Sequence, residues 1–363
     1  MTPYRATTPG RPVGARAVQR RAPAGARRWM RALAILAAVA LALVLAGCAG
    51  SSSSNSILLY NGQHPQVTSE LVAAFEKRTG IKVNVHTNDG IVLADQLLQE
   101  GSSSPADVYL TENSPELVTI DEHGLFTKLA SSTLAQVPAR FQAANGNWVG
   151  IARRISALAY DPSLVSAGSL PKSVLELAQP QWKGKVAIAP TDSDFPPLVG
   201  AVIAAYGRQA AINWLAGLKR NAQLYQDDES VVAAVNRGDV ATGIINHYYW
   251  YRLRTELGAS KMHSSVYYFP NRDVGSVENI SGAGVLASSS HQRDAQAFVS
   301  FLVSPEAQQI LAHGYDFEYP ARPGVAPNPQ LTPLSVIEPA SLGANALGND
   351  QPAARLIEES GLA

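Results

Sequence analysis

The stretch SILLYNGQHPQVTSELVAAFEKRTGIKVNVHT, residues 56–87, predicts one strand-helix-strand unit. The apolar run SILLYN is typical of a short buried strand, and IKVNVHT alternates with the period of two that indicates a second strand. Between them, Val67, Leu71 and Phe75 recur at helical spacing, and Gly80 provides a stop. This order predicts two neighbouring parallel strands joined by a helix.

The same alternation continues along the chain. SPELVTIDEHG (114–124) begins with a serine that suits the N-cap, followed by proline at the first helical position. Strand and helix alternate as far as a terminal helix near QPAARLIEES (351–360), which predicts the α/β class with parallel-rich sheets. The other predicted strands are ADVYLTEN (106–113), GKVAIAP (184–190), VATGIIN (240–246) and SGAGVLAS (281–288).

Residues 1–47 predict a signal peptide. Arginines precede an apolar run from Ala32 to Ala46, which at about fifteen residues is short for a membrane span and suits a signal-peptide core. The run ends in Leu-Ala-Gly-Cys at Cys48, which resembles the cleavage motif of bacterial lipoproteins, where the cysteine becomes the lipidated first mature residue. The alternative is an uncleaved anchor helix.

Two details of export stay open. Translation from Met30 instead of Met1 would give a signal of ordinary length. The pair Arg27-Arg28 suggests twin-arginine export, although the residues after it fit that route poorly.

Cys48 is the only cysteine, so the sequence excludes disulfides and thiolate metal sites once it is acylated. Acyl chains on Cys48 would anchor the protein to the outer face of the cytoplasmic membrane, within the cell envelope. Residues 48–56 then form the lipidated cysteine and a flexible tether of small polar residues. The mature chain of about 310 residues exceeds what one core usually supports, which predicts two lobes.

The charge balance disfavours nucleic acid as a partner. The chain has 29 basic and 29 acidic residues, but eight of the arginines lie within residues 1–48, where there is no acid. The remaining 21 basic residues against 29 acids give a balance of about −8. Phosphate backbones require a basic face, whereas an acidic domain tolerates a cation.

A cluster of aromatic residues follows the predicted strand VATGIIN. In INHYYWYRLRTELG (245–258), Asn246 suits an N-cap and Gly258 a stop, so Tyr248 and Tyr249 begin a helix at the end of a strand. Open α/β sheets bind ligands outside the carboxyl ends of their strands. The phenols therefore suit a ligand site, and the alternative is that the rings pack between lobes or onto a sugar.

Two further strand ends deliver side chains to the same predicted edge. YNGQH (60–64) places His64 at the start of a helix, and ADVYLTEN delivers Glu112. Taken singly, His64 suits a cap or surface position and Glu112 a solvated acid. Taken together with the two phenols, they predict a histidine, a carboxylate and two tyrosines around one cleft.

These segments resemble a known family. LYNGQH, PADVYLTEN and INHYYWY are similar to motifs of bacterial ferric-ion-binding proteins, the receptors of iron ABC importers, and the similarity spans essentially the whole mature chain. The resemblance implies the two-lobed type II periplasmic-binding-protein fold with a hinge, and no enzyme activity. It also implies that His64, Glu112, Tyr248 and Tyr249 bind Fe(III), the transported ligand.

The chemistry of this donor set suits Fe(III). A hard trivalent ion prefers anionic oxygen. A free phenol has a pKa of about 10, and a trivalent cation at bonding distance displaces its proton. Two phenolates and one carboxylate offset the ion's charge, and His64 adds a neutral nitrogen. Four donors leave two positions of an octahedron open, and loading should release protons.

The sequence departs from the better-known family members where those bind a synergistic phosphate. The loop APTDSDF (189–195) and the segment YQDDES (225–230) place acids there, while an asparagine is kept. Carboxylates would repel phosphate, so we expect water, another anion or one of these acids to complete the shell. Arg153 and Arg154 could balance a small anion such as carbonate or form structural salt bridges. The candidate co-ligands or anion-pocket residues are Asp192, Ser193, Asp194, Asp228, Asn246 and Arg154.

The family fold implies discontinuous lobes. The first lobe would take residues 56–154 and 279–329, and the second 155–278 and 330–363. Metal binding across them would favour a closed form, which the membrane permease recognises. We expect a monomer anchored to the membrane by its lipid.

Other functions are weighed against this one. A receptor of the same fold could bind a ferric chelate, a polyamine, a sugar or an oxyanion such as sulfate. A secreted hydrolase is disfavoured because the sequence has no G-x-S-x-G elbow and no H-E-x-x-H helix. A structural lipoprotein without a ligand would leave the four convergent side chains unexplained.

Overall fold

A computed structural model describes residues 56–343 and 345–363, which belong to one compact unit. The predicted signal peptide, Cys48 and the tether before Ser56 lie outside the described residues. Within the described ranges, no helix combines the length and apolar character needed to cross a membrane.

The opening strand-helix-strand unit is present as predicted. β1 (Ser56–Gly62) and β2 (Lys82–Thr87) pair in parallel, and α2 (Pro65–Thr79) connects them. Gly80 ends α2 with φ of 74°, a left-handed conformation that favours glycine. β3 (Val108–Thr111) pairs in parallel with the other side of β1.

The sheet is rich in parallel pairs but mixed. Its strand order is β2-β1-β3-β10-β5-β8-β6-β7. β10 (Glu278–Leu286) runs antiparallel to β3 and to β5 (Trp148–Tyr160), and β5 runs antiparallel to β8 (Thr242–Asn246). Parallel pairs lie on either side of these two central antiparallel strands, and β5 was not predicted. The remaining strands are β4 (Phe126–Thr127), β6 (Val186–Ile188), β7 (Ala222–Leu224), β9 (Ser265–Tyr267) and β11 (Tyr319–Pro320).

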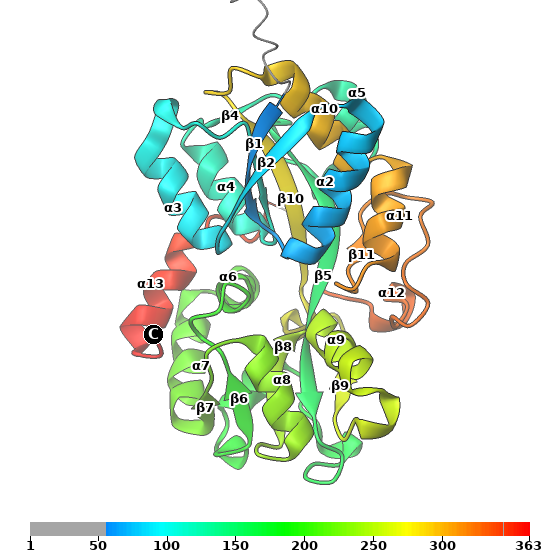
Figure 1. Ribbon diagram of the computed structural model, residues 1–363. Coiled ribbons are helices and arrows are strands. Elements are labelled where there is room, and N and C mark those ends of the chain that lie inside the picture. The colour runs from blue at the N-terminus through cyan, green and yellow to red at the C-terminus, as the bar shows by residue number, and fades with distance from the viewer. Residues whose placement is uncertain (1–55, 344) are drawn as a thin grey trace, which may run out of the picture. The chain divides into compact units, whose positions relative to one another are not determined.

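Helices cover the sheet at most of the positions that the sequence predicts. α4 (Ser114–Glu122) has Asn113 at its N-cap, so the predicted serine cap is shifted by one residue. α13 (Gln351–Ser360) is the predicted terminal helix and packs beside α6 and α7 (Figure 1). The other helices are α3 (Gly90–Glu100), α5 (Ser131–Leu134), α6 (Phe195–Tyr206), α7 (Arg208–Asn221), α8 (Asp228–Arg237), α9 (His247–Leu257), α10 (Gln292–Leu302), α11 (Pro305–His313) and α12 (Leu334–Ile337).

The buried apolar side chains gather in separate cores on the two sides of the central strands. We call lobe 1 the part around the core formed by residues 57–152 and 280–321. Lobe 2 surrounds the cores formed by residues 155–277 and 317–362. β5 contributes to the cores of both lobes, and β10 lies beside it and begins directly after Val277 of the lobe 2 core (Figure 1). They therefore form the connection across which side chains of the two lobes meet.

Candidate metal centre between the lobes

The four predicted ligands lie together where the lobes meet. His64 precedes α2 and Glu112 follows β3, so both belong to lobe 1, while Tyr248 lies in the first turn of α9 in lobe 2. The Tyr248 hydroxyl lies 3.3 Å from Glu112 Oε2, and His64 Nδ1 lies 3.0 Å from Glu112 Oε1. Glu112 thus contacts a histidine of its own lobe and a tyrosine of the other lobe.

Tyr249 completes the group. Its ring centroid lies 4.2 Å from that of Tyr248 and 6.3 Å from that of His64, while Tyr248 and His64 are 5.1 Å apart. Adjacent residues in a first helical turn thus direct both phenol rings towards one histidine. A group of three or more His, Cys, Asp or Glu side chains arranged for a metal does not occur in the part of the chain that the structure describes.

Burial favours the uncharged form of all four groups. It raises the pKa of Glu112 to about 8 and lowers the pKa of His64 to about 4. Burial also raises the pKa of Tyr248 and of Tyr249 well above the usual value. A neutral imidazole has a free lone pair, whereas the oxygens need a cation to become anionic.

Arg154 supplies a positive charge at the centre of this group. It lies on β5 and is fully buried. Its Nη1 contacts Glu112 and lies 3.1 Å from the Tyr248 hydroxyl, and its Nη2 lies 3.0 Å from Asp194 Oδ1. Arg153, the neighbour that the sequence could not separate from it, instead pairs with Glu278 through Nε at 2.6 Å. Only Arg154 of the two therefore acts within the site.

Asp194 joins the ligand group from the loop before α6. Its Oδ2 accepts a hydrogen bond of 2.7 Å from the Tyr248 hydroxyl. Burial opposes its ionisation, but Arg154 and the hydrogen bonds it accepts hold the pKa of Asp194 below its usual value. Asp194 and Arg154 therefore form a buried pair of opposite charge beside the phenol.

Two further acids occupy the N-termini of helices. Asp192 Oδ1 accepts from the backbone N–H of Asp194, and its Oδ2 accepts from that of Asp228, both at 3.0 Å. Asp228 Oδ2 accepts from the backbone N–H of Asn246 at 2.8 Å. Burial raises the pKa of Asp192 to about 7 and that of Asp228 well above its usual value. One backbone N–H group at the start of each of α6, α8 and α9 is thus bonded to a carboxyl group of the chain itself.

Ser193 and Asn246, the other candidate residues of the anion pocket, do not bind these backbone N–H groups. The backbone oxygen of Ser193 accepts a hydrogen bond of 3.3 Å from Asn113 Nδ2, which links lobe 2 to lobe 1. Asn246 is the N-cap of α9 as predicted, although its side chain makes no capping bond, and its buried Oδ1 has no hydrogen-bond partner.

Gln63 and Glu318 have no role in the predictions made from the sequence. Gln63 Oε1 lies 2.8 Å from His64 Nδ1, and Gln63 Nε2 lies 3.3 Å from both carboxyl oxygens of Glu318. Both residues are buried. The only indication in the sequence was that Gln63 directly precedes the predicted metal-binding histidine in YNGQH, which places its side chain close to His64.

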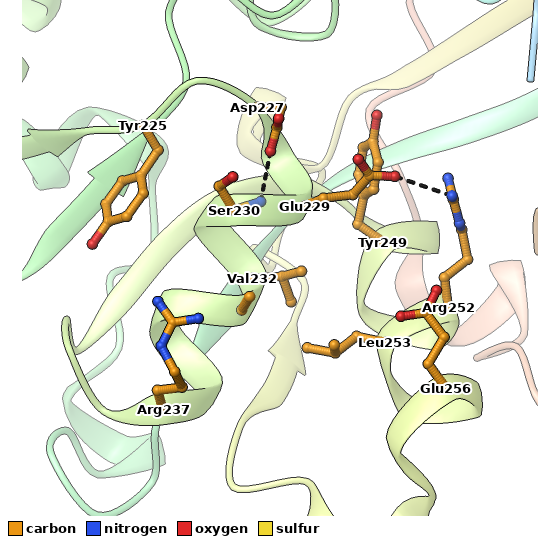
Figure 2. A pocket seen from close by; sticks show the side chains of 11 residues that line it. Tyr225, Asp227, Glu229, Ser230, Val232, Arg237, Tyr249, Arg252, Leu253 and Glu256 are labelled. Atoms are coloured by element: carbon orange, nitrogen blue, oxygen red, sulfur yellow. Dashed lines mark hydrogen bonds and ion pairs between the residues drawn. The ribbon is translucent and has the colours of Figure 1, made fainter.

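Two pockets adjoin the site. One of about 330 Å³ is lined by residues of both lobes, including His64, Glu112 and Tyr249. The other, of about 600 Å³, lies between α8 and α9 and shares Tyr249 as a wall; Figure 2 shows it with Arg252, which pairs with Glu229 at 3.0 Å. Tyr249 thus separates the interlobe pocket from a second one within lobe 2.

Residues 70–335 match the protein family described as bacterial extracellular solute-binding protein. The chain is 40% identical to the Fe(3+)-binding periplasmic protein of Serratia marcescens over 328 residues, which cover 90% of this chain and 97% of that protein. It is 35% identical to the major ferric iron-binding protein of Neisseria meningitidis serogroup B, covering 88% of this chain and 97% of the relative.

A solved structure is also similar. Iron-bound HitA from Pseudomonas aeruginosa superimposes with a TM-score of 0.80 at 39% sequence identity, covering 84% of this chain and 99% of that one.

Proposed function

The chain belongs to the family of bacterial extracellular solute-binding proteins, and from this premise we propose that it captures Fe(III) between its lobes and delivers it to an ABC permease in the membrane. The relatives named for ferric iron match it over nearly their whole length. The observation that carries the proposal is the meeting of Tyr248 from lobe 2 with Glu112 from lobe 1 at 3.3 Å. No catalytic step is needed for this function.

The ligands of the captured ion are His64, Glu112, Tyr248 and Tyr249. Fe(III) ionises both phenols, and the two phenolates with the carboxylate bring three negative charges to a trivalent ion. Because these side chains come from both lobes, the ion bridges the lobes and stabilises the closed arrangement. The permease then distinguishes loaded from unloaded receptor by shape.

No external anion is needed to balance the charge of the loaded site. Arg154 and Asp194 lie 3.0 Å apart and neutralise one another. The three anionic ligands neutralise the ion. A phosphate added to this buried site would leave negative charge uncompensated, at a high cost in a medium of low dielectric constant. This balance supports capture without phosphate.

The anion position is also filled by the protein. Asp192 accepts hydrogen bonds from the backbone N–H groups of Asp194 and Asp228, which are donors that an anion at these helix N-termini would use. Phosphate would have to displace this carboxyl group. We therefore disfavour phosphate as a co-ligand.

Asp194 is our candidate for a fifth ligand. Its Oδ2 lies 2.7 Å from the Tyr248 hydroxyl, and oxygens at this separation can share one small octahedral ion. Asp192 and Asp228 already accept hydrogen bonds from backbone N–H groups and are therefore less suited to act as iron ligands. Water would complete the shell.

The protein acts at the cell envelope. The named relatives are periplasmic or ferric iron-binding proteins, and the solute-binding family implies a permease as the partner. We propose in addition that the chain is a monomer anchored through a lipid on Cys48. Incorporation of labelled palmitate into the wild-type chain and its loss in Cys48→Ala would test the anchor.

Titration of the soluble chain from Ser51 onward with ferric citrate tests the function. Phenolate-to-Fe(III) charge transfer should turn the protein orange to red, and Tyr248→Phe with Tyr249→Phe should abolish the colour. Tyr251→Phe is the matched control, because Tyr251 lies buried on the same helix but bonds to Thr332 instead of the site. A wild-type protein that stays colourless and iron-free would refute iron capture and favour another solute.

A further inference from the structure

We propose that Gln63 is a positioning residue for metal capture: its amide oxygen holds the imidazole proton of His64 on Nδ1 and so leaves Nε2 as the nitrogen that binds the ion. The inference rests on the proposed function, because it concerns how a predicted ligand is prepared for Fe(III). It adds a residue that touches no metal.

The orientation of the Gln63 amide follows from its neighbours. The side-chain oxygen accepts a hydrogen bond of 2.7 Å from the backbone N–H of His64. A backbone N–H can only donate, so the amide must present its oxygen there and not its NH₂ group. The same oxygen lies 2.8 Å from His64 Nδ1. Because an amide oxygen can only accept, Nδ1 must carry the proton.

The other end of the amide is held equally firmly. Gln63 Nε2 lies 3.3 Å from both carboxyl oxygens of Glu318, which is fully buried and also accepts 3.2 Å from the hydroxyl of Ser281. Gln63 itself is 2% exposed, and its backbone oxygen accepts 2.7 Å from Asn61 Nδ2. Rotating the amide by half a turn would set NH₂ against a backbone N–H and leave two buried groups unpaired.

Glu112 supports the same protonation but cannot maintain it. Its Oε1 lies 3.0 Å from His64 Nδ1, so it too accepts from that nitrogen. Glu112 is itself a proposed ligand, so the captured ion would engage its carboxyl group. Gln63 then remains as the acceptor for Nδ1–H, which is why the role falls to the glutamine.

The consequence concerns affinity. A neutral imidazole has one proton, which can reside on either nitrogen. A tautomer with the proton on Nε2 would present N–H to the ion and would have to rearrange before binding. Outer partners that fix a ligating histidine typically contribute a factor of ten to one hundred in metal affinity.

Nitrogen-15 NMR of histidine-labelled protein from Ser51 onward tests the proposal, with Ga(III) as a diamagnetic trivalent probe. The signals of His64 among the seven histidines are assigned by their loss in His64→Gln. We expect the metal-free wild type to have a protonated Nδ1 and a bare Nε2, and Ga(III) to shift Nε2. Because Glu112 also faces Nδ1, the tautomer is measured in a Glu112→Ala background, where adding Gln63→Met should give a mixture of tautomers. Gln63→Met alone should weaken the affinity for Ga(III) roughly tenfold to hundredfold.

Gln308→Met is the matched control. Gln308 is also a fully buried glutamine, and its amide bonds to backbone oxygens of Ile151 and Leu302 at 2.8 and 2.9 Å, away from His64. It should destabilise the fold comparably and leave the His64 tautomer unchanged.

Each contrary outcome has a distinct meaning. A proton on Nε2 in the metal-free wild type, or a tautomer that Gln63→Met leaves unchanged in the Glu112→Ala background, overturns the role of Gln63. Ga(III) bound through Nδ1 overturns it as well, while leaving His64 a ligand. A wild type that binds no Ga(III) or Fe(III) overturns the proposed function and the inference with it.

Discussion

The guanidinium Nη1 of Arg154 lies 3.1 Å from the hydroxyl of Tyr248 and also contacts Glu112. One buried cation on the strand shared by both lobes therefore touches a phenol of lobe 2 and a carboxylate of lobe 1. These are the groups that we propose the captured ion joins, so Arg154 and the ion would compete for the same oxygens. The ion would then partly replace the positive charge that Arg154 supplies.

Arg154→Gln tests this competition. The substitution leaves Glu112 and Asp194 buried without their cation, so the free energy of unfolding of the metal-free protein should fall by about 3–5 kcal/mol. Saturation with Ga(III) should recover part of that loss, because the ion compensates the same carboxylates. Urea denaturation with and without Ga(III) measures both effects.

Arg153→Gln is the control for that experiment. Arg153 lies on the same strand but pairs with Glu278, outside the ligand group. The decrease in the free energy of unfolding caused by Arg153→Gln should be equal in the metal-free and the loaded protein. If the two variants respond identically to Ga(III), Arg154 does not compete with the ion.

Asp192→Ala should create a dependence on phosphate. Removing the carboxyl group leaves the backbone N–H groups of Asp194 and Asp228 without their acceptor, so that an anion can bind to them. Phosphate should raise the affinity of the variant for Fe(III), measured by competition with citrate, and should leave the wild type unchanged. Asp227→Ala is the control, because that side chain caps Ser230 instead. Phosphate dependence in the wild type would refute the self-filled anion position.

Glu116→Gln should make stability less dependent on pH. Burial raises the pKa of Glu116 to about 8 from a usual value of 4.5. A raised carboxyl pKa means that the native protein holds a proton that the unfolded chain has lost, so this stability is complete below about pH 4.5 and is lost as the pH rises through 8.

Glutamine cannot ionise and can keep the contacts with Asn113 and Tyr109, whose atoms lie 3.2 Å from the carboxyl oxygens. Between pH 5 and pH 8, the variant should therefore gain roughly 3–4 kcal/mol relative to the wild type, which thermal unfolding at the two values would measure. Parallel pH profiles for both proteins would show that Glu116 ionises normally.

Local patterns were enough to predict most of the elements, but not the central strands. β1, α2 and β2 follow from apolar periodicity and a helix-ending glycine, which act over neighbouring residues. β5 was missed because Arg153 and Arg154 interrupt its apolar run WVGIARRISALAY. Both arginines form ion pairs with acids more than 35 residues away in the chain, including Glu278 and Glu112. Partners so distant in the sequence leave no local pattern from which the strand could be predicted.

The site was predictable to the extent that strand ends define one edge of the sheet. His64, Glu112 and the two tyrosines each follow a strand or begin a helix, so their convergence follows from topology. The hydrogen bond between Asp194 and Tyr248 does not, because it depends on how the loop before α6 lies against α9. The same limit applies to Gln63 and Glu318, whose contact joins residues 255 positions apart.

A crystal structure of the Fe(III)-loaded protein tests the central claim most directly. The account predicts one iron between the lobes, bonded to the phenolate oxygens of Tyr248 and Tyr249, a carboxylate oxygen of Glu112 and Nε2 of His64, with no phosphate in the shell. Iron held elsewhere, or a cleft in which these four side chains surround an organic solute without metal, would contradict it.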